Sequence, residues 1–135
     1  MIKQVRGFSL LELMIVVMVI GIITAIAVPN LLQSKAAANE ASAISSLRLM
    51  VSAQFTRNTN TSSYAPDLAT LKSASLVDDV LGSGTKDGYY FSTSGGSVSF
   101  SINANPIVHL STGKRSFFAD QSGVIRYATA NAPAT

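Results

Sequence analysis

The sequence predicts an α+β protein in which a long, kinked N-terminal helix packs on a four-stranded antiparallel sheet. Two observations carry this prediction. Residues 8–57 follow a helical pattern that is apolar on all sides in its first half and apolar on one face in its second. From Gly88 onward, apolar and polar residues alternate with the period of a strand that has one buried face. A chain of 135 residues has room for one domain besides the helix.

The first half of the helix has the length of a membrane span. Residues 13–34 carry no charged side chain, and at about 1.5 Å per residue they measure roughly 33 Å, enough to cross the hydrocarbon core of a bilayer. Lys3 and Arg6 precede this segment, so the positive-inside rule predicts a cytoplasmic N-terminus and export of the rest. Glu12 lies at the front of the apolar segment, where a carboxylate needs a partner.

Two residues are expected to disturb the apolar half of the helix. Pro29 lacks an N–H donor and clashes with the preceding turn, so it should kink the helix or open it locally. Gly21 marks the other end of the stretch that could loosen. The second half, residues 35–57, is predicted to be amphipathic, with Glu40 off its apolar stripe. The residues of that stripe are Ala41, Ile44, Leu47, Val51 and Phe55.

Residues 58–87 are predicted to form a polar loop and one short helix. The helix is expected over residues 64–71, because Pro66 suits a first helical turn and Asp67 interacts favourably with the positive end of the helix dipole. The remainder of this region is rich in serine, aspartate and glycine. It is therefore expected to be turn-rich and solvated.

Residues 88–127 are predicted to form the sheet. Four strands are expected, around residues 89–91, 98–102, 115–119 and 124–127. In the first hairpin, Val98, Phe100 and Ile102 alternate with serines and should share the buried face. The second hairpin turns at residues 120–123. Residues 128–135 are expected to form a loose tail.

The chemical inventory argues against catalysis and against a metal or cofactor site. There is no cysteine and a single histidine, His109, which excludes thiolate zinc sites and multi-histidine sites. Asp78, Asp79 and Asp87 stand among glycines as in a calcium loop, but their spacing matches no ligand pattern, and a solvated loop is favoured. Two S-x-x-K matches lie in glycine-bearing loops rather than at a helix start. We therefore expect no enzyme activity, no metal and no cofactor.

The net charge does not indicate nucleic-acid binding. The formal charge is +3, with 10 basic and 7 acidic residues, and removal of Lys3 and Arg6 would lower it to +1. No run of basic residues interleaves with aromatic residues in the way that single-strand binding requires.

The N-terminal segment allows three interpretations. It could be a secretory signal, cut after Ala27 in the A-x-A-like sequence at residues 25–27, which would release a secreted binding domain. It could be a plain membrane anchor with Glu12 at the headgroups. The third interpretation comes from residues 6–13, Arg-Gly-Phe-Ser-Leu-Leu-Glu-Leu, which resemble the class III leader junction of type IV pilins and type II secretion pseudopilins. The resemblance is specific over residues 3–30 and much weaker beyond them.

The resemblance implies a processing site and an assembly site. A prepilin peptidase would cut between Gly7 and Phe8 and methylate the new amine of Phe8. Glu12 and that amine are four residues apart on one helix, so they could pair within the subunit. The resemblance implies instead that Glu12 pairs with the Phe8 amine of a neighbouring subunit. A buried ion pair adds little net stability but fixes register, so Glu12 would set the axial stagger between subunits. In some filaments of the family, the stretch that corresponds to residues 21–29 is extended.

The resemblance also implies a life cycle and a set of partners. Residues 1–7 would be a cleaved leader, residues 8–34 the membrane and filament-core half of the helix, and residues 35–135 a globular pilin domain. The subunit would wait in the inner membrane with its N-terminus cytoplasmic. It would then enter a homopolymeric type IV pilus, extracellular or periplasmic, through an assembly platform with a motor ATPase. A type II secretion pseudopilin or a minor pilin is the alternative. The missing cysteine pair departs from the disulfide loop of many pilins.

Overall fold

The fold was obtained as a computed structural model, which describes residues 7–129. The leader residues 1–6 and the tail residues 130–135 lie outside the described residues. The chain divides into two compact units, Met1–Gln33 and Ser34–Thr135. Helix α1 (Leu10–Thr61) contributes to both, and it ends four residues later than the sequence predicts.

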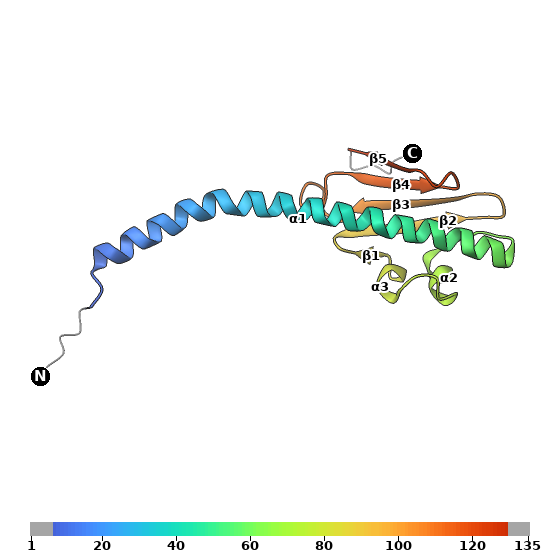
Figure 1. The fold of residues 1–135 in the computed structure, drawn as a ribbon, viewed down its shortest axis with the longest axis horizontal. Coiled ribbons are helices and arrows are strands. Elements are labelled where there is room, and N and C mark those ends of the chain that lie inside the picture. Colours follow the sequence, from blue (N-terminus) through green and yellow to red (C-terminus); the bar gives the residue numbers. More distant parts are fainter. Residues whose placement is uncertain (1–6, 130–135) are drawn as a thin grey trace, which may run out of the picture. The chain divides into compact units, whose positions relative to one another are not determined.

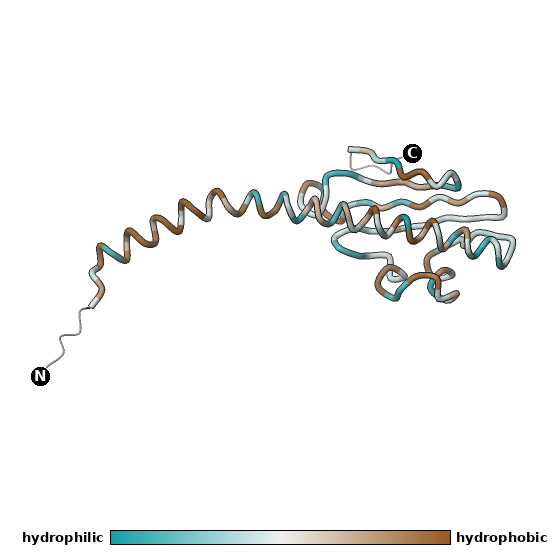
Figure 2. Tube along the Cα trace, in the orientation of Figure 1, coloured by the Kyte–Doolittle hydropathy of each residue, from teal (hydrophilic) through white to brown (hydrophobic). Residues whose placement is uncertain are grey.

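The part of α1 in the first unit is an isolated apolar helix. In the described chain, α1 alone is long and apolar enough to cross a membrane, and no residue of its most apolar window is buried in the protein. Figure 2 shows that most residues along this part of the helix are apolar. The helix is continuous through Gly21 and Pro29, so the chain remains helical at both positions. A kink there stays a prediction.

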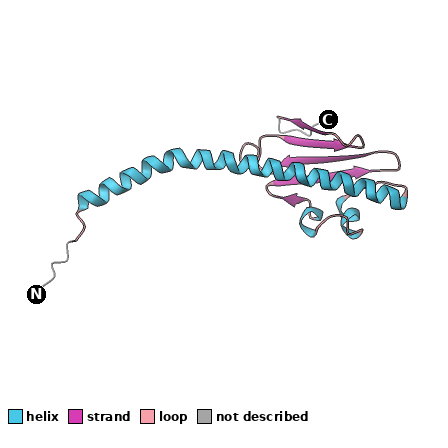
Figure 3. Ribbon diagram, viewed as in Figure 1, coloured by secondary structure: helices cyan, strands magenta, loops and turns pink. Residues whose placement is uncertain are grey.

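The second unit contains a five-stranded antiparallel sheet in which neighbours in sequence are neighbours in space (Figures 1 and 3). The strands are β1 (Thr85–Lys86), β2 (Tyr89–Gly95), β3 (Phe100–Pro106), β4 (Ser116–Asp120) and β5 (Ile125–Ala128). The predicted number of four was therefore wrong. The additional strand β1 is two residues long, too short to show an alternating pattern, and it pairs with the start of β2.

The predicted strand positions otherwise agree with the sheet, apart from one side chain. Phe100 and Ile102 are buried, as expected, but Val98 is 84% exposed. Val98 lies in the turn between β2 and β3, where Gly95 pairs with Phe100 and closes the hairpin. Alternation alone did not reveal where the strand begins.

The second half of α1 lies across one face of the sheet and buries it (Figure 1). The predicted stripe is rotated relative to the observed one, because Ala41 is exposed and Phe55 is 41% exposed. Small side chains and one amide face the sheet instead, which permits a close approach of the helix. The buried residues of α1 are Ala36, Glu40, Ala43, Ser46, Leu47, Met50, Ala53 and Gln54.

Two short helices, α2 (Leu68–Ser73) and α3 (Asp79–Gly82), occupy the connection between α1 and β1. The short helix expected over residues 64–71 thus begins later, because Asp67 is its N-cap and accepts a hydrogen bond from the backbone N–H of Thr70 at 2.7 Å. Asp78 caps α3 in the same way. The sequence analysis did not predict α3.

Candidate functional site

The proposed cleavage site lies in front of the helix in an open, non-helical segment. Gly7 and Phe8 precede the first residue of α1, and Phe8 is 90% exposed. Among the residues that the structure describes, no atom lies within 4 Å of a Cβ placed on Gly7, apart from its own chain neighbours. The bond between Gly7 and Phe8 is therefore sterically open to a protease that requires an extended substrate.

Glu12 takes part in a reciprocal cap of the first helical turn. Its Oε2 accepts hydrogen bonds from the backbone N–H and from the hydroxyl of Ser9, both at 3.0 Å. In return, the Ser9 hydroxyl accepts a hydrogen bond from the backbone N–H of Glu12 at 3.2 Å. This arrangement is a capping box, and the S-x-x-E spacing of residues 9–12 is the signal that the sequence analysis missed.

No salt bridge reaches Glu12 from any residue between 7 and 129. Within residues 7–129, the donors to this carboxylate are the neutral backbone N–H and hydroxyl of Ser9. A full positive charge for Glu12 thus has to come from outside the described chain or from cleavage, which would create an amine on Phe8. Both residues lie at the same end of the apolar helix.

A second carboxylate, Glu40, is buried where α1 crosses the sheet. Its Oε1 accepts hydrogen bonds from the backbone N–H groups of Lys114, at 2.8 Å, and Arg115, at 3.2 Å. Its Oε2 is 2.8 Å from both Nε and Nη2 of Arg115. Burial opposes ionisation of Glu40, but these donors outweigh it and the net effect lowers the pKa.

The Arg115 side chain and the Tyr89 hydroxyl complete this cluster. The Tyr89 hydroxyl donates a hydrogen bond to the Arg115 carbonyl at 2.8 Å, and burial together with the charge of Glu40 raises the pKa of Tyr89. The Arg115 guanidinium lies 5.5 Å from the ring centre of Phe117 and 5.1 Å from that of Tyr127. The hydrogen bonds between Glu40 and residues 114 and 115 thus fasten α1 to the start of β4.

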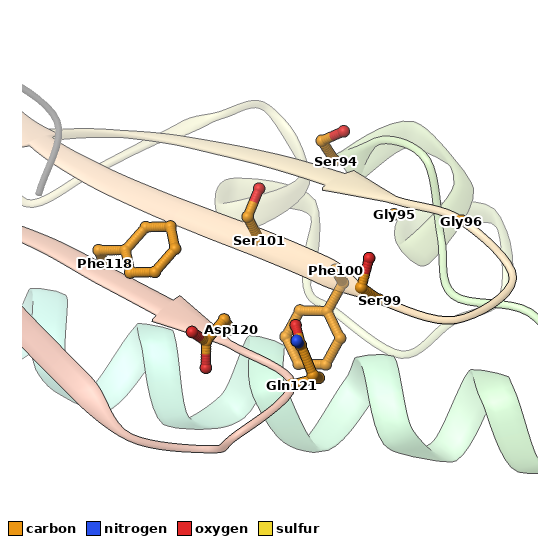
Figure 4. Close-up of a pocket in the computed structure, with 9 residues that line it drawn as sticks. All are labelled: Ser94, Gly95, Gly96, Ser99, Phe100, Ser101, Phe118, Asp120 and Gln121. Carbon is orange, nitrogen blue, oxygen red and sulfur yellow. The ribbon is translucent and has the colours of Figure 1, made fainter. Parts of the chain in front are cut away.

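A shallow polar hollow lies beside the β2–β3 turn and β4 (Figure 4). Serines line it on one side, and Phe118, Asp120 and Gln121 lie on the other. Asp120 is engaged by Ser122 and by Arg126, and these contacts lower its pKa to about 2. The residues that line the hollow include no histidine or cysteine, and its one carboxylate, Asp120, is already engaged by Ser122 and Arg126.

The three aspartates of the possible calcium loop each contact a different partner. Asp78 caps α3, Asp79 pairs with Lys72 at 3.2 Å, and Asp87 accepts a hydrogen bond from Ser42. Within residues 7–129 there is no group of three or more candidate ligands that could hold a metal ion. His109 is partly buried and lies in the β3–β4 connection, in a bridge with Gly113.

Comparison with known proteins relates the N-terminal part of the chain to two kinds of protein. Residues 2–28 match the family described as the prokaryotic N-terminal methylation motif. The chain is 47% identical over 49 residues to the type IV major pilin protein PilA of Myxococcus xanthus, which is 36% of this chain and 22% of that protein. It is 43% identical over 42 residues to the type II secretion system core protein G of Escherichia coli. That match covers 31% of this chain and 29% of core protein G.

The family match covers the processing motif and the front of the apolar helix, and each relative matches about a third of this chain. The chain spans less than a third of the length of the curated relatives it matches. The resemblance found in residues 6–13 is confirmed by an independent family match over residues 2–28. The chain thus carries the prokaryotic N-terminal methylation motif on an α+β fold, and over 42 to 49 residues it is similar to a type IV major pilin and to core protein G of type II secretion systems.

Proposed function

We propose that this chain is a structural subunit of a type IV pilus filament. The observation that carries the proposal is the methylation motif directly in front of a solvent-exposed apolar helix of membrane-spanning length. An apolar surface of this size has to be covered by lipid or by other protein. In a subunit that is first stored in a membrane and later packed against copies of itself, lipid covers this helix before assembly and other subunits cover it afterwards.

Processing and register follow from the N-terminal geometry. Prepilin peptidase cleaves the open bond between Gly7 and Phe8 and methylates the amine of Phe8. Glu12 then exchanges its Ser9 donors for the Phe8 amine of a neighbouring subunit, in an apolar surrounding that penalises any unpaired carboxylate. This pairing fixes the axial stagger. A membrane assembly platform with a motor ATPase supplies the mechanical work.

The mature N-terminus is the first test. Intact mass and N-terminal sequencing of the protein from its native membrane should give a chain that begins at Phe8 with one added methyl group. A chain that begins at Val28 would instead establish an ordinary secreted domain. An uncleaved chain from a host with an active prepilin peptidase would leave a plain membrane anchor.

The second test separates processing from assembly. Glu12→Ala and Glu12→Gln should both be cleaved normally but should abolish most surface filaments, because neither offers a charge to the Phe8 amine. Filaments counted by electron microscopy, with mature N-termini checked in the same cells, provide the measurement. Wild-type filament numbers from Glu12→Ala would refute the assembly role of Glu12.

A type II secretion pseudopilin is the second candidate, and one observation favours it. The sequence matches core protein G of two organisms over the same N-terminal region. Deletion of the gene separates the two functions: loss of surface filaments with normal protein secretion supports the pilus subunit. Accumulation of secreted enzymes in the periplasm, with filaments intact, supports the pseudopilin. If the chain were a minor pilin, the deletion would leave filaments of ordinary composition in reduced number.

A further inference from the structure

The sheet has a second face, opposite to the one on which α1 packs. Successive side chains of a strand point to opposite faces, so Phe91, Ile102 and Phe117 point to the core and their neighbours point away from it. We call the side of the sheet that points away from α1 the outer face. On β3 and β4 it consists of Ser101, Asn103, Asn105, Ser116, Phe118 and Asp120.

Three polar atoms of the outer face are buried and have no hydrogen-bond partner among the residues that the structure describes. They are Oδ1 of Asn103, Oδ1 of Asn105 and Oγ of Ser116, and we call them the unpaired acceptors. Each can accept a hydrogen bond, and a buried acceptor that lacks one loses its contact with water without compensation. Native proteins pair nearly all such groups. The outer face therefore requires donors beyond those of the described side chains.

The unpaired acceptors lie together on two neighbouring strands. Asn103 of β3 pairs with Phe118 of β4, and two steps along this antiparallel register bring Asn105 opposite Ser116. Ser116 is 0% exposed, although it points away from the core with α1. Tyr90, which pairs with Asn105 from the β2 side, is 52% exposed. The burial of the outer face is thus concentrated on the side of β4.

Strand β5 ends directly beside the unpaired acceptors. Its last residue, Ala128, pairs with Ser116 of β4. The chain bends at Thr129, and residues 130–135 follow it outside the described part. Neighbouring strands are about 4.8 Å apart, so Ala128 and Asn105 are roughly 10 Å apart across β4. The six residues 130–135 can span up to about 20 Å when extended, so they can reach all three unpaired acceptors.

The composition of residues 130–135, Ala-Asn-Ala-Pro-Ala-Thr, suits a segment that lies flat on a sheet. Each residue except Pro133 offers a backbone N–H, and Asn131 adds an amide donor. No side chain in the segment is charged, so docking would leave no side-chain charge buried. Pro133 restricts the backbone to conformations that include the extended one. The other source of donors is buried water.

We propose that residues 130–135 fold over the outer face of β3 and β4 and donate hydrogen bonds to the unpaired acceptors. The segment is then an ordered part of the sheet unit, in contrast to the loose tail that the sequence alone predicts. It covers the polar atoms that α1, on the opposite face, leaves unpaired. The sheet is thus covered on one face by the second half of α1 and on the other by the segment that follows β5.

Backbone hydrogen exchange of the full chain tests this proposal. The protein is kept in detergent micelles, and exchange at residues 130–135 is followed by nuclear magnetic resonance, with a free peptide of the same six residues as the reference. The amides of residues 130–132 should exchange at least about tenfold more slowly in the protein than in the peptide. Exchange at the peptide rate throughout residues 130–135 would overturn the proposal and leave water as the donor to the unpaired acceptors.

Two variants locate the contact, one on each side of it. Asn105→Ala removes an unpaired acceptor and should speed the exchange of the segment several-fold. Ser101→Ala is the matched control, because Ser101 lies on the same strand and face but holds none of the unpaired acceptors. Ala132→Pro removes a donor from the segment and leaves the sheet unaltered, so it keeps the test decisive if Asn105→Ala unfolds the sheet.

After correction for the intrinsic exchange rates, Ala132→Pro should also speed the exchange of the remaining amides of the segment. Slow exchange in the wild type that persists unchanged in Ala132→Pro and in a folded Asn105→Ala would place the segment elsewhere and would overturn the proposal. An equal acceleration in Ser101→Ala and Asn105→Ala would likewise overturn it, because the effect would not depend on the unpaired acceptors.

Discussion

The two halves of α1 belong to one helix but meet different surroundings. In the first half every described residue of the membrane-scale segment is exposed, and Leu13, for example, is 62% exposed. In the second half Leu47 and Met50 are fully buried against the sheet. The first half is built from branched and large apolar residues on all sides, whereas the second half mixes a few large apolar residues with many alanines and polar residues.

The difference shows that apolarity and burial have separate meanings in this chain. The more apolar half buries nothing within the subunit, so its stability as a helix in water is not supported by tertiary contacts. The less apolar half carries the core, because small residues let it approach the sheet closely. The first half is thus suited to an external apolar phase, and the second to an internal one.

The largest expected effect is a difference in unfolding free energy between a leucine substitution in the second half of α1 and one in the first half. Leu47→Ala should lower the free energy of unfolding of the sheet domain by about 2 to 5 kcal/mol, because it leaves a cavity in a closed core. Leu13→Ala should leave that free energy unchanged, since Leu13 makes no contribution to this core. Denaturant unfolding of the full chain in detergent micelles, followed by the near-ultraviolet signal of the tyrosines, measures both.

Two results would contradict the separate roles of the two halves of α1. If Leu13→Ala destabilised the sheet domain as much as Leu47→Ala, the two halves would form one cooperative unit, and the division of labour argued above would be wrong. A smaller loss for Leu47→Ala, comparable to that of an exposed residue, would place the core elsewhere.

Much of the fold could be predicted from periodicity, and the exceptions have physical reasons. The long helix, the α+β class and four of the five strands follow from patterns several residues long. The buried face of α1 could not be derived, because a count of large apolar residues favours Phe55 over Gln54. Gln54 is buried nevertheless, since its amide donates to the Ala65 carbonyl and accepts from the Ala65 N–H. Such pairings join residues whose contact no local pattern encodes.

The candidate site divides in the same way. Gly7, Phe8 and Glu12 lie in one short motif and could be recognised from the sequence alone. The Glu40 cluster could not, because Glu40 and Arg115 are 75 positions apart and come together only when α1 crosses the sheet. The sequence analysis expected Glu40 to lie off the apolar stripe, and it is buried with its donors.

The next prediction concerns the contacts of Glu40 that hold the second half of α1 on the sheet. Glu40→Gln should lower the free energy of unfolding at neutral pH by about 2 kcal/mol, because hydrogen bonds to a charged group are lost. The folded pKa of Glu40 lies below its ordinary value of 4.5. Its contribution is thus fully present above pH 4.5 and is lost as pH falls through the folded pKa. Glu40→Gln should flatten that part of the stability profile.

Asp120→Asn is the matched control for this pH profile. The Asp120–Arg126 pair is more exposed to solvent, and its carboxylate has a folded pKa of about 2 against an ordinary value of 3.8. Asp120→Asn should therefore alter the profile only in that lower window. Stability that declined identically in wild type and Glu40→Gln as the pH fell below 4.5 would show that Glu40 does not fasten the helix.

The smallest expected effect concerns the first turn of the exposed half of α1. No tertiary contact holds this turn, so its stability depends on the Ser9–Glu12 cap, whereas turns in the second half are also held by the sheet. Ser9→Ala removes the acceptor of the Glu12 N–H and should weaken the turn by about 1 kcal/mol. The hydrogen exchange of the Glu12 amide, measured in micelles, should therefore become about fivefold faster. Thr24→Ala is the control, because the Thr24 hydroxyl bonds only a carbonyl that the helix already uses. Unchanged exchange at Glu12 in Ser9→Ala would mean that the surrounding apolar phase, and not the cap, orders the start of the helix.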